Sequence, residues 1–256
     1  MSVVRSLRER MPNRSRSERA TTPDSPMTDG EALFAAILAE PDDDTPRLVY
    51  ADWLDEHDRP ERAEFIRVQV AAAHSPTREL QTREKTLLGL HEEEWLAPLK
   101  GRGRPLEGGA GGQFRRGFVE VVWMSAAAFL DRARLLFEQA PVRELRVTRV
   151  TPQEFRALTH SPRLARLRGL DLSDRRLGDA VVAELLRSQF TASLRVLRLR
   201  GCGITDAGAR ALANLPFDWP LRELDVSHNP VGESALALLL DRFGDAVVAE
   251  GLERVV

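Results

Sequence analysis

The sequence contains very little of what covalent cross-links and metal centres are usually built from. Cys202 is the only cysteine among the 256 residues, so an intrachain disulfide is impossible and a reducing compartment is expected. The five histidines are scattered along the chain, and the segment His91-Glu-Glu-Glu-Trp95 lacks the second histidine of a zinc-binding H-E-x-x-H motif. We therefore expect neither a disulfide framework nor a zinc site.

Long apolar runs are also missing. No segment approaches the ~18 apolar residues of a membrane-spanning helix, and residues 1–26 lack the apolar core of a secretion signal. These absences predict a cytoplasmic protein without membrane contact. Residues 1–26 are rich in arginine and serine and show no apolar period, which indicates a disordered tail; alternatively, translation starts at Met27, where ordered patterning begins.

Lysine is almost absent, with only Lys85 and Lys100, so nearly all positive charge comes from arginine. Arginine suits bidentate recognition of carboxylates and phosphates, but the coding bias of an Arg- and Ala-rich genome is the favoured explanation of its abundance. The net charge of −2 is unevenly distributed: residues 27–64 hold twelve acids against three arginines, and residues 65–256 sum to +4. No segment is basic enough to predict nucleic-acid binding.

Helix signals fill the first part of the chain. Thr28 and Glu31 have the spacing of a capping box, and prolines stand where the first turns of two later helices are expected. A fourth helix is expected to end near Trp95. The sequence thus predicts an all-α module over residues 27–100, followed by a Gly-rich linker over residues 101–113.

After this linker the apolar residues recur in a repeat. Five segments read apolar-x-x-apolar-x-apolar, and their starts are 24, 25, 27 and 27 residues apart, which predicts one strand and one helix per unit. The apolar positions are Phe118/Val121/Trp123, Val142/Leu145/Val147, Leu167/Leu170/Leu172, Leu194/Leu197/Leu199 and Leu221/Leu224/Val226.

Two units extend into the longer pattern L-x-x-L-x-L-x-x-N/C-x-L. Cys202 and Asn229 occupy its N/C position, whereas the preceding unit has Arg175 there and is expected to have an imperfect ladder. A buried structural thiol at Cys202 is favoured over a nucleophile, which would need an activating base. No G-x-S-x-G motif is present, and the glycines of residues 108–112 lack the Lys-Ser/Thr of a phosphate-binding loop.

Two parts of the chain resemble known families. The stretch Leu199-Arg-Gly-Cys-Gly-Ile-Thr-Asp-Ala-Gly-Ala-Arg-Ala-Leu212 resembles leucine-rich repeats of the ribonuclease-inhibitor type, which pair a strand with a full helix. The stretches Pro41-Asp-Asp-Asp-Thr-Pro-Arg-Leu-Val-Tyr-Ala-Asp-Trp-Leu-Asp-Glu56 and Glu61-Arg-Ala-Glu-Phe-Ile-Arg-Val-Gln69 resemble the bacterial repeat-companion domain. That family is known for lying beside repeat domains, and it brings no established activity.

The resemblances imply an α/β fold. We expect a short leucine-rich-repeat solenoid of about five units over residues 114–256, with parallel strands inside and helices outside, preceded by the all-α module. The first unit is degenerate and needs a cap, so we expect the helix ending near Trp95 to cover Phe118 and Trp123.

The residues between the apolar strand positions are expected to face the concave side of the sheet. Arg198 should lie within salt-bridge reach of Asp171 and Asp225 on the neighbouring strands. A solvated sheet face is polar in any case, so these charges either recognise a partner or only neutralise one another. The candidate binding residues are Arg146, Asp171, Arg198, Arg200, Glu223 and Asp225.

Two features of the helical module have competing interpretations. Its acidic cluster comprises Asp42, Asp43, Asp44, Asp52, Asp55, Glu56 and Asp58. Their spacing lacks the D-x-D-x-D-G loop of a calcium site, and helix starts already favour acids. Tyr50 and Trp53 could recognise a partner, but their i, i+4 relations to Leu54 and Val49 favour core packing.

Together these observations predict a non-catalytic scaffold that binds a macromolecule, a protein, through the concave sheet. No cofactor, metal or nucleic acid is expected. Two alternatives remain: a metal-dependent enzyme or regulator that uses the acidic module, and a structural subunit that associates with itself. The oligomeric state stays open.

Overall fold

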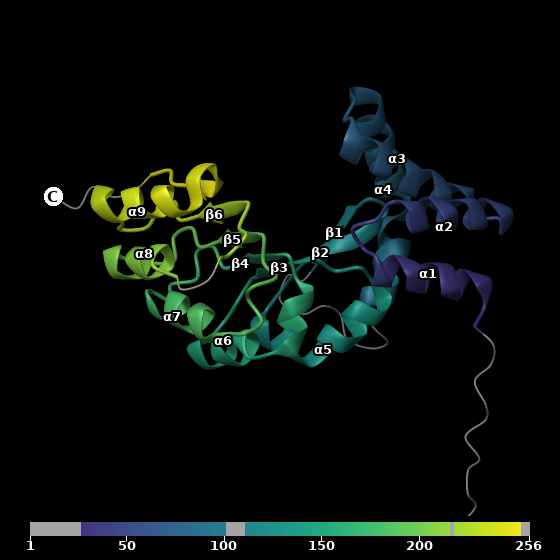
Figure 1. Ribbon diagram of the computed structural model, residues 1–256. Coiled ribbons are helices and arrows are strands. Elements are labelled where there is room, and N and C mark those ends of the chain that lie inside the picture. The colour runs from purple at the N-terminus through teal and green to yellow at the C-terminus, as the bar shows by residue number, and fades with distance from the viewer. Residues whose placement is uncertain (1–26, 101–110, 216–217, 252–256) are drawn as a thin grey trace, which may run out of the picture.

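The structure is a computed structural model that describes residues 27–100, 111–215 and 218–251 (Figure 1). The expected tail and residues 101–110 of the expected linker lie outside the described residues. The described chain begins with four helices, as predicted: α1 (Asp29–Ala39), α2 (Thr45–Glu56), α3 (Pro60–His74) and α4 (Arg78–Lys100). Thr28 and Glu31 form the predicted capping box at the start of α1.

A seven-stranded sheet follows, with its strands side by side in sequence order. The strands are β1 (Gly111–Arg115), β2 (Phe118–Met124), β3 (Glu144–Val147), β4 (Gly169–Asp171), β5 (Val196–Arg198), β6 (Glu223–Asp225) and β7 (Val247–Val248). Strands β2 to β7 are parallel, and β1 pairs with β2 in an antiparallel hairpin. Strand β1 begins inside the segment expected to be a linker. Its turn is made by Arg116 and Gly117, both with positive φ, which is the geometry that favours a tight hairpin.

Helices cover one face of this sheet. They are α5 (Ala126–Gln139), α6 (Pro152–Thr159), α7 (Ala180–Arg187), α8 (Asp206–Ala213) and α9 (Glu233–Phe243), with single 3-10 turns at Pro162–Arg166 and Gly244–Ala246. Figure 1 shows these helices along the outer side of a curved arrangement whose inner side carries the strands. We call the sheet face opposite the helices the inner face. No helix in the described ranges has the length and apolar character needed to cross a bilayer.

The repeat ladder is built at the predicted position. The Asn229 amide donates hydrogen bonds to the carbonyls of Leu199 (2.8 Å) and Val226 (2.9 Å). Cys202 takes the equivalent place one unit earlier: it is buried, and its Sγ donates to the carbonyl of Leu172 at 3.0 Å. Burial raises the pKa of the Cys202 thiol to about 12. The assignment of Cys202 as a buried ladder residue is confirmed.

Arg175 fills the ladder position of the preceding unit instead of leaving it empty. Its guanidinium donates to the carbonyl of Ser173 at 3.0 Å and to the carbonyl of Thr148 in the unit before. The Arg175 side chain therefore links backbone carbonyls of neighbouring repeat units by hydrogen bonds, as the Asn229 side chain does two units later.

Strand β2 departs from the predicted register by one residue. Gln113 pairs with Val121 but Phe114 pairs with Val119, so Glu120 is the extra residue of a β-bulge. As a result Val122 and Met124 enter the core, and Trp123 lies on the inner face. The expectation that Trp123 is a core position of this unit was wrong, whereas Val121 is fully buried as expected, although it pairs with the inner-face position Glu144.

The bulge directs Glu120 into the helical module. Its Oε1 accepts hydrogen bonds from Arg47 at 2.7 Å and from Arg116 at 2.9 Å. Arg47 is fully buried and also donates to the carbonyls of Pro41 (2.7 Å) and Arg116 (2.9 Å). Three hydrogen bonds are thus donated by the Arg47 guanidinium, and Glu120 of the repeat domain neutralises its charge.

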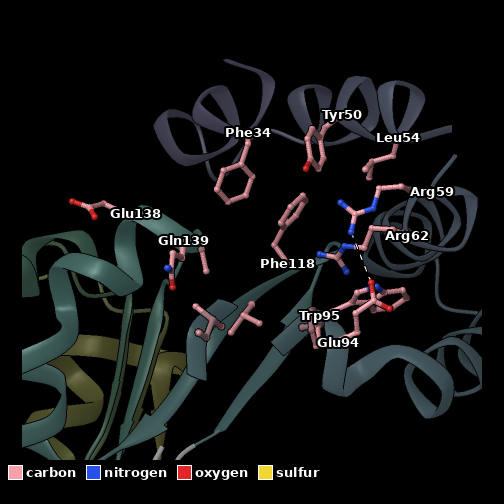
Figure 2. A pocket seen from close by; sticks show the side chains of 14 residues that line it. Phe34, Tyr50, Leu54, Arg59, Arg62, Glu94, Trp95, Phe118, Glu138 and Gln139 are labelled. Atoms are coloured by element: carbon pink, nitrogen blue, oxygen red, sulfur yellow. Dashed lines mark ion pairs between the residues drawn. The ribbon is translucent and has the colours of Figure 1, made fainter. Parts of the chain in front are cut away.

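An apolar junction joins the two parts of the chain, as expected, but through other contacts. The ring of Phe118 lies 5.9 Å from Phe34 and 6.0 Å from Tyr50. Trp95 packs instead against Phe65, 4.7 Å away, and Phe114, 6.4 Å away. Aromatic residues of all four helices of the module thus cover the first hairpin of the sheet (Figure 2).

Arg47→Ala should destabilise the fold by about 3–5 kcal/mol, because it leaves Glu120 buried without its main counter-ion. Arg67 is the matched control: it is half-exposed and pairs with Asp52 and Asp55 at 2.7 Å, so Arg67→Ala should cost less than about 1 kcal/mol. Urea unfolding followed by tryptophan fluorescence measures both. If both variants lose the same small amount of unfolding free energy, the Arg47–Glu120 pair does not hold the junction.

Cys202 should resist thiol reagents in the folded protein, because a pKa of about 12 keeps the buried thiol protonated at pH 8. Ellman's reagent should release one equivalent of chromophore only after denaturing urea is added, with N-acetylcysteine as the exposed-thiol control. Prompt labelling of the native protein would contradict the ladder position.

Candidate functional site: the inner face of the sheet

Strand pairing arranges the side chains of the inner face in rows across the sheet. One row contains Trp123, Arg146, Asp171, Arg198 and Asp225, which are directly opposite one another on strands β2 to β6. The parallel row contains Val121, Glu144, Gly169, Val196 and Glu223. From β3 to β6 these rows are the predicted ones; on β2 the bulge replaces Glu120 and Val122 by Val121 and Trp123.

Arg198 is the centre of the charge pairing on this face, but its partners differ from the predicted ones. Its guanidinium binds Glu223 in a bidentate manner, at 2.6 and 3.1 Å, and reaches Glu144 at 2.7 Å. Asp171 and Asp225 were expected to be its partners. Their Oδ1 atoms instead accept hydrogen bonds from the backbone N–H of Ser173 and Ser227, each at 2.9 Å.

Gly169 makes the pairing between Glu144 and Arg198 possible. Glu144 is on β3 and Arg198 is on β5, so the two side chains must meet across β4. A Cβ at Gly169 would lie 2.8 Å from Glu144 Cγ, which is closer than real Cβ atoms approach other atoms. The missing side chain therefore opens the path that Glu144 follows across the middle strand.

The Glu144 carboxylate forms ion pairs with three arginines. Besides Arg198, it accepts contacts from Arg115 (3.1 Å) and Arg146 (3.2 Å), and its side chain is only 5% exposed. Burial by itself would raise the pKa of Glu144, but the three guanidinium groups outweigh it and hold the pKa below the usual glutamate value. Glu144 was expected in this row but was not among the candidate binding residues, and Arg115 was not predicted at all, although the glycine at position 169 was a visible signal of a side chain crossing there.

Two large side chains on the inner face remain available for contact. Arg200, just beyond β5, is exposed and its guanidinium has no ion-pair partner among the described residues. Trp123 is half-buried against Gly111, where a Cβ would lie 2.5 Å from the indole ring. Tryptophan and arginine are the residue types that contribute most energy at protein interfaces.

Four of the seven acids in the acidic cluster of the helical module pair with arginines. Asp42 pairs with Arg143, and Asp44 pairs with Arg116 at 3.2 Å. Asp52 and Asp55 share Arg67 (2.7 Å each). In the part of the chain that the structure describes, no three His, Cys, Asp or Glu side chains gather in an arrangement that could hold a metal ion.

Comparison with known proteins supports the repeat assignment. A family model described as "Leucine Rich repeat" matches residues 192–213 and 220–239, which contain β5, α8, β6 and most of α9. Ribonuclease inhibitor of Sus scrofa is 43% identical over 74 residues, which are 28% of this chain and 16% of that protein. The chain therefore contains leucine-rich repeats of this kind, and the aligned stretch covers a small part of the relative.

Glu144→Gln should destabilise the fold by about 1–2 kcal/mol at pH 7, because three arginines lose their shared charge. A glutamate whose folded pKa lies below its unfolded value stabilises the fold above the unfolded pKa, near 4.5, and loses this contribution as the pH falls through the folded value. Urea titrations should therefore show a difference between variant and parent at pH 7 that shrinks as the pH falls below the unfolded pKa near 4.5.

The matched control for this substitution is Glu138→Gln. Glu138 is exposed on α5 and pairs with Arg134 at 3.0 Å, so its substitution should change stability little at either pH. A Glu144 effect that is independent of pH would refute the charge-based account.

Proposed function

We propose that this protein is a non-catalytic binding scaffold that recognises a protein partner through the inner face of its leucine-rich-repeat sheet. The observation that carries the proposal is the combination on that face of an internally paired charge network with Arg200 and Trp123, which have capacity left for a partner. A partner would complete contacts that the chain itself leaves unmade.

The fixed network supports recognition for a physical reason. Arg198 is held by Glu144 and by both oxygens of Glu223, so its rotamer is already selected before binding. Each rotamer-rich side chain that is ordered only on association costs about 0.5–1.5 kcal/mol. A surface ordered in advance avoids much of this cost and presents one pattern of charge to its partner.

The relative's name agrees with a protein as the ligand. Ribonuclease inhibitor of Sus scrofa is named for the inhibition of a protein. Because that stretch is only 16% of the relative, the identity of the partner does not follow from the similarity. We propose a cytoplasmic protein whose partner is selected by the residues of its own inner face.

The helical module is proposed to act as a cap of the repeat-companion type. The first strands of a repeat array expose an apolar flank, which must be covered for the array to stay soluble. Phe34, Tyr50 and Trp95 cover Phe118 and Phe114 of the first hairpin. Such a cap needs no catalytic residues.

Arg200→Glu should abolish capture of the partner, while Arg210→Glu should leave it intact. Both arginines are exposed and belong to the same repeat unit, but Arg210 lies on α8, on the outer side. The biotinylated protein and its two variants serve as bait in a native extract, and quantitative mass spectrometry compares the captured proteins. Loss of capture with Arg210→Glu alone would move the binding site to the helices. Arg198→Ala is a poorer probe, because it also frees Glu144 and Glu223 and should lower stability.

A further inference from the structure

Four arginines lie side by side along the end of the sheet where its parallel strands begin. Each directly precedes the first residue of β3, β4, β5 or β6, and they are Arg143, Arg168, Arg195 and Arg222. The backbone N–H of each of the last three donates to the carbonyl of the arginine before it, at 2.6 to 2.7 Å. We call these four residues the arginine row. Neighbouring strands lie about 4.8 Å apart, so the row is about 14 Å long.

The chain neutralises only the first arginine of this row. Arg143 forms an ion pair with Asp42, which belongs to the loop between α1 and α2. Arg168, Arg195 and Arg222 have no ion-pair partner among the described residues. Like charges that are directly opposite one another on neighbouring strands destabilise a sheet. Burial lowers the pKa of the Arg168 guanidinium, and the charge of Arg143 lowers it further. An anion along the row would therefore relieve a repulsion that the fold itself leaves in place.

The guanidinium groups at the start of the row are held by long hydrogen bonds to the next repeat unit. Arg143 donates to the carbonyl of Arg166 at 3.2 Å, and Arg168 donates to the carbonyl of Ser193 at 3.4 Å. Each bond uses one of the five N–H donors of an arginine. Within the row, only Arg143 has a guanidinium nitrogen that is both buried and unpaired in the part of the chain that the structure describes. The free donors of the other row arginines are therefore open to a ligand from solvent.

The contact with Asp42 shows how an acidic chain segment fits this end of the sheet. A hollow of about 430 Å³ lies where the loop after α1 meets the repeats. The acids in its lining, Glu40 and Asp42, belong to this loop, whereas its arginines, Arg143, Arg166 and Arg168, belong to the repeats. The fork of an arginine matches the two oxygens of a carboxylate. A second acidic segment that approached beside this loop would meet Arg168 and then the remainder of the row.

We propose that the arginine row binds an extended acidic segment of a protein partner, with its carboxylates on Arg168, Arg195 and Arg222. A length of 14 Å corresponds to about four residues of extended chain. Peptide carboxylates suit this row better than nucleic-acid phosphates, because the chain has a net charge of −2 and lacks the basic balance of nucleic-acid-binding domains. The proposal rests on the proposed function only in taking the partner to be a protein, and it adds a contact surface that adjoins the inner face.

The test uses the full chain and three fluorescein-labelled probes: octaglutamate, octaglutamine and octathymidylate. Fluorescence anisotropy at low ionic strength should show saturable binding of octaglutamate and none of octaglutamine. Raising the salt concentration from about 20 mM to about 200 mM should weaken octaglutamate binding at least about fivefold, because the paired charges are partly solvated. No saturable binding of octaglutamate at up to about 1 mM protein would overturn the proposal. Tighter binding of octathymidylate would also overturn it and would make a nucleic acid the ligand.

Substitutions assign the binding to the row. Arg168→Gln with Arg195→Gln should weaken octaglutamate binding about tenfold. Arg222→Gln should weaken it about threefold, and it keeps the test decisive if the double variant fails to fold, because Arg222 is exposed. The matched control is Arg134→Gln with Arg210→Gln, which removes the same charge from outer helices where each arginine pairs with a carboxylate of its own helix. Equal losses in the two double variants would show general charge attraction and refute the row.

This outcome is separable from that of the proposed function. The probe titration needs no natural partner, whereas the capture experiment with Arg200→Glu tests the inner face in a native extract. Octaglutamate binding that depends on the row supports this inference even if Arg200→Glu leaves capture intact. Loss of capture with Arg200→Glu, together with absence of octaglutamate binding, would overturn the row and leave the inner face as the binding surface.

Discussion

The buried ion pair between Arg47 and Glu120 fixes how the repeats begin. A charge this deeply buried is tolerated only with a well-placed counter-ion, and Arg47 obtains one because the bulge in β2 turns Glu120 toward the helical module. The same bulge shifts the remainder of β2 by one residue. Trp123 is thereby moved out of the core and onto the inner face, so the attachment of the cap and the composition of the candidate binding surface follow from one constraint.

The sequence predicted the helices and the strands from β3 to β6 because their patterns leave one interpretation. Leu170, Leu197 and Leu224 are each followed by a charged residue, so each strand buries the face that carries its leucine. Strand β2 reads Phe-Val-Glu-Val-Val-Trp-Met, which is apolar in either register. Its register is decided by Arg47, 73 residues away in the chain, and no local pattern contains that information.

On the inner face, the sequence predicts which residues are neighbours but not which side chains pair. Strand pairing correctly placed Asp171 and Asp225 beside Arg198, yet these short carboxylates are used by the backbone N–H groups two residues further on. Arginine is long enough to pass its direct neighbours and to select Glu144 and Glu223. Row positions are therefore predictable from periodicity, whereas the ion pairs depend on side-chain reach and on a gap such as that left by Gly169.

Burial and pairing together separate the structural charges of this chain from those available for recognition. Arg47 and Arg198 form ion pairs with carboxylates of the chain itself, at the junction and on the sheet face. Arg200 has no such partner among the described residues but is solvated, so it costs little to keep until a protein contacts it. Arg62 is partly buried, and its guanidinium lies over the rings of Trp95 and Phe118 at 4.8 and 5.3 Å, so aromatic faces take the place that a carboxylate takes at Arg47.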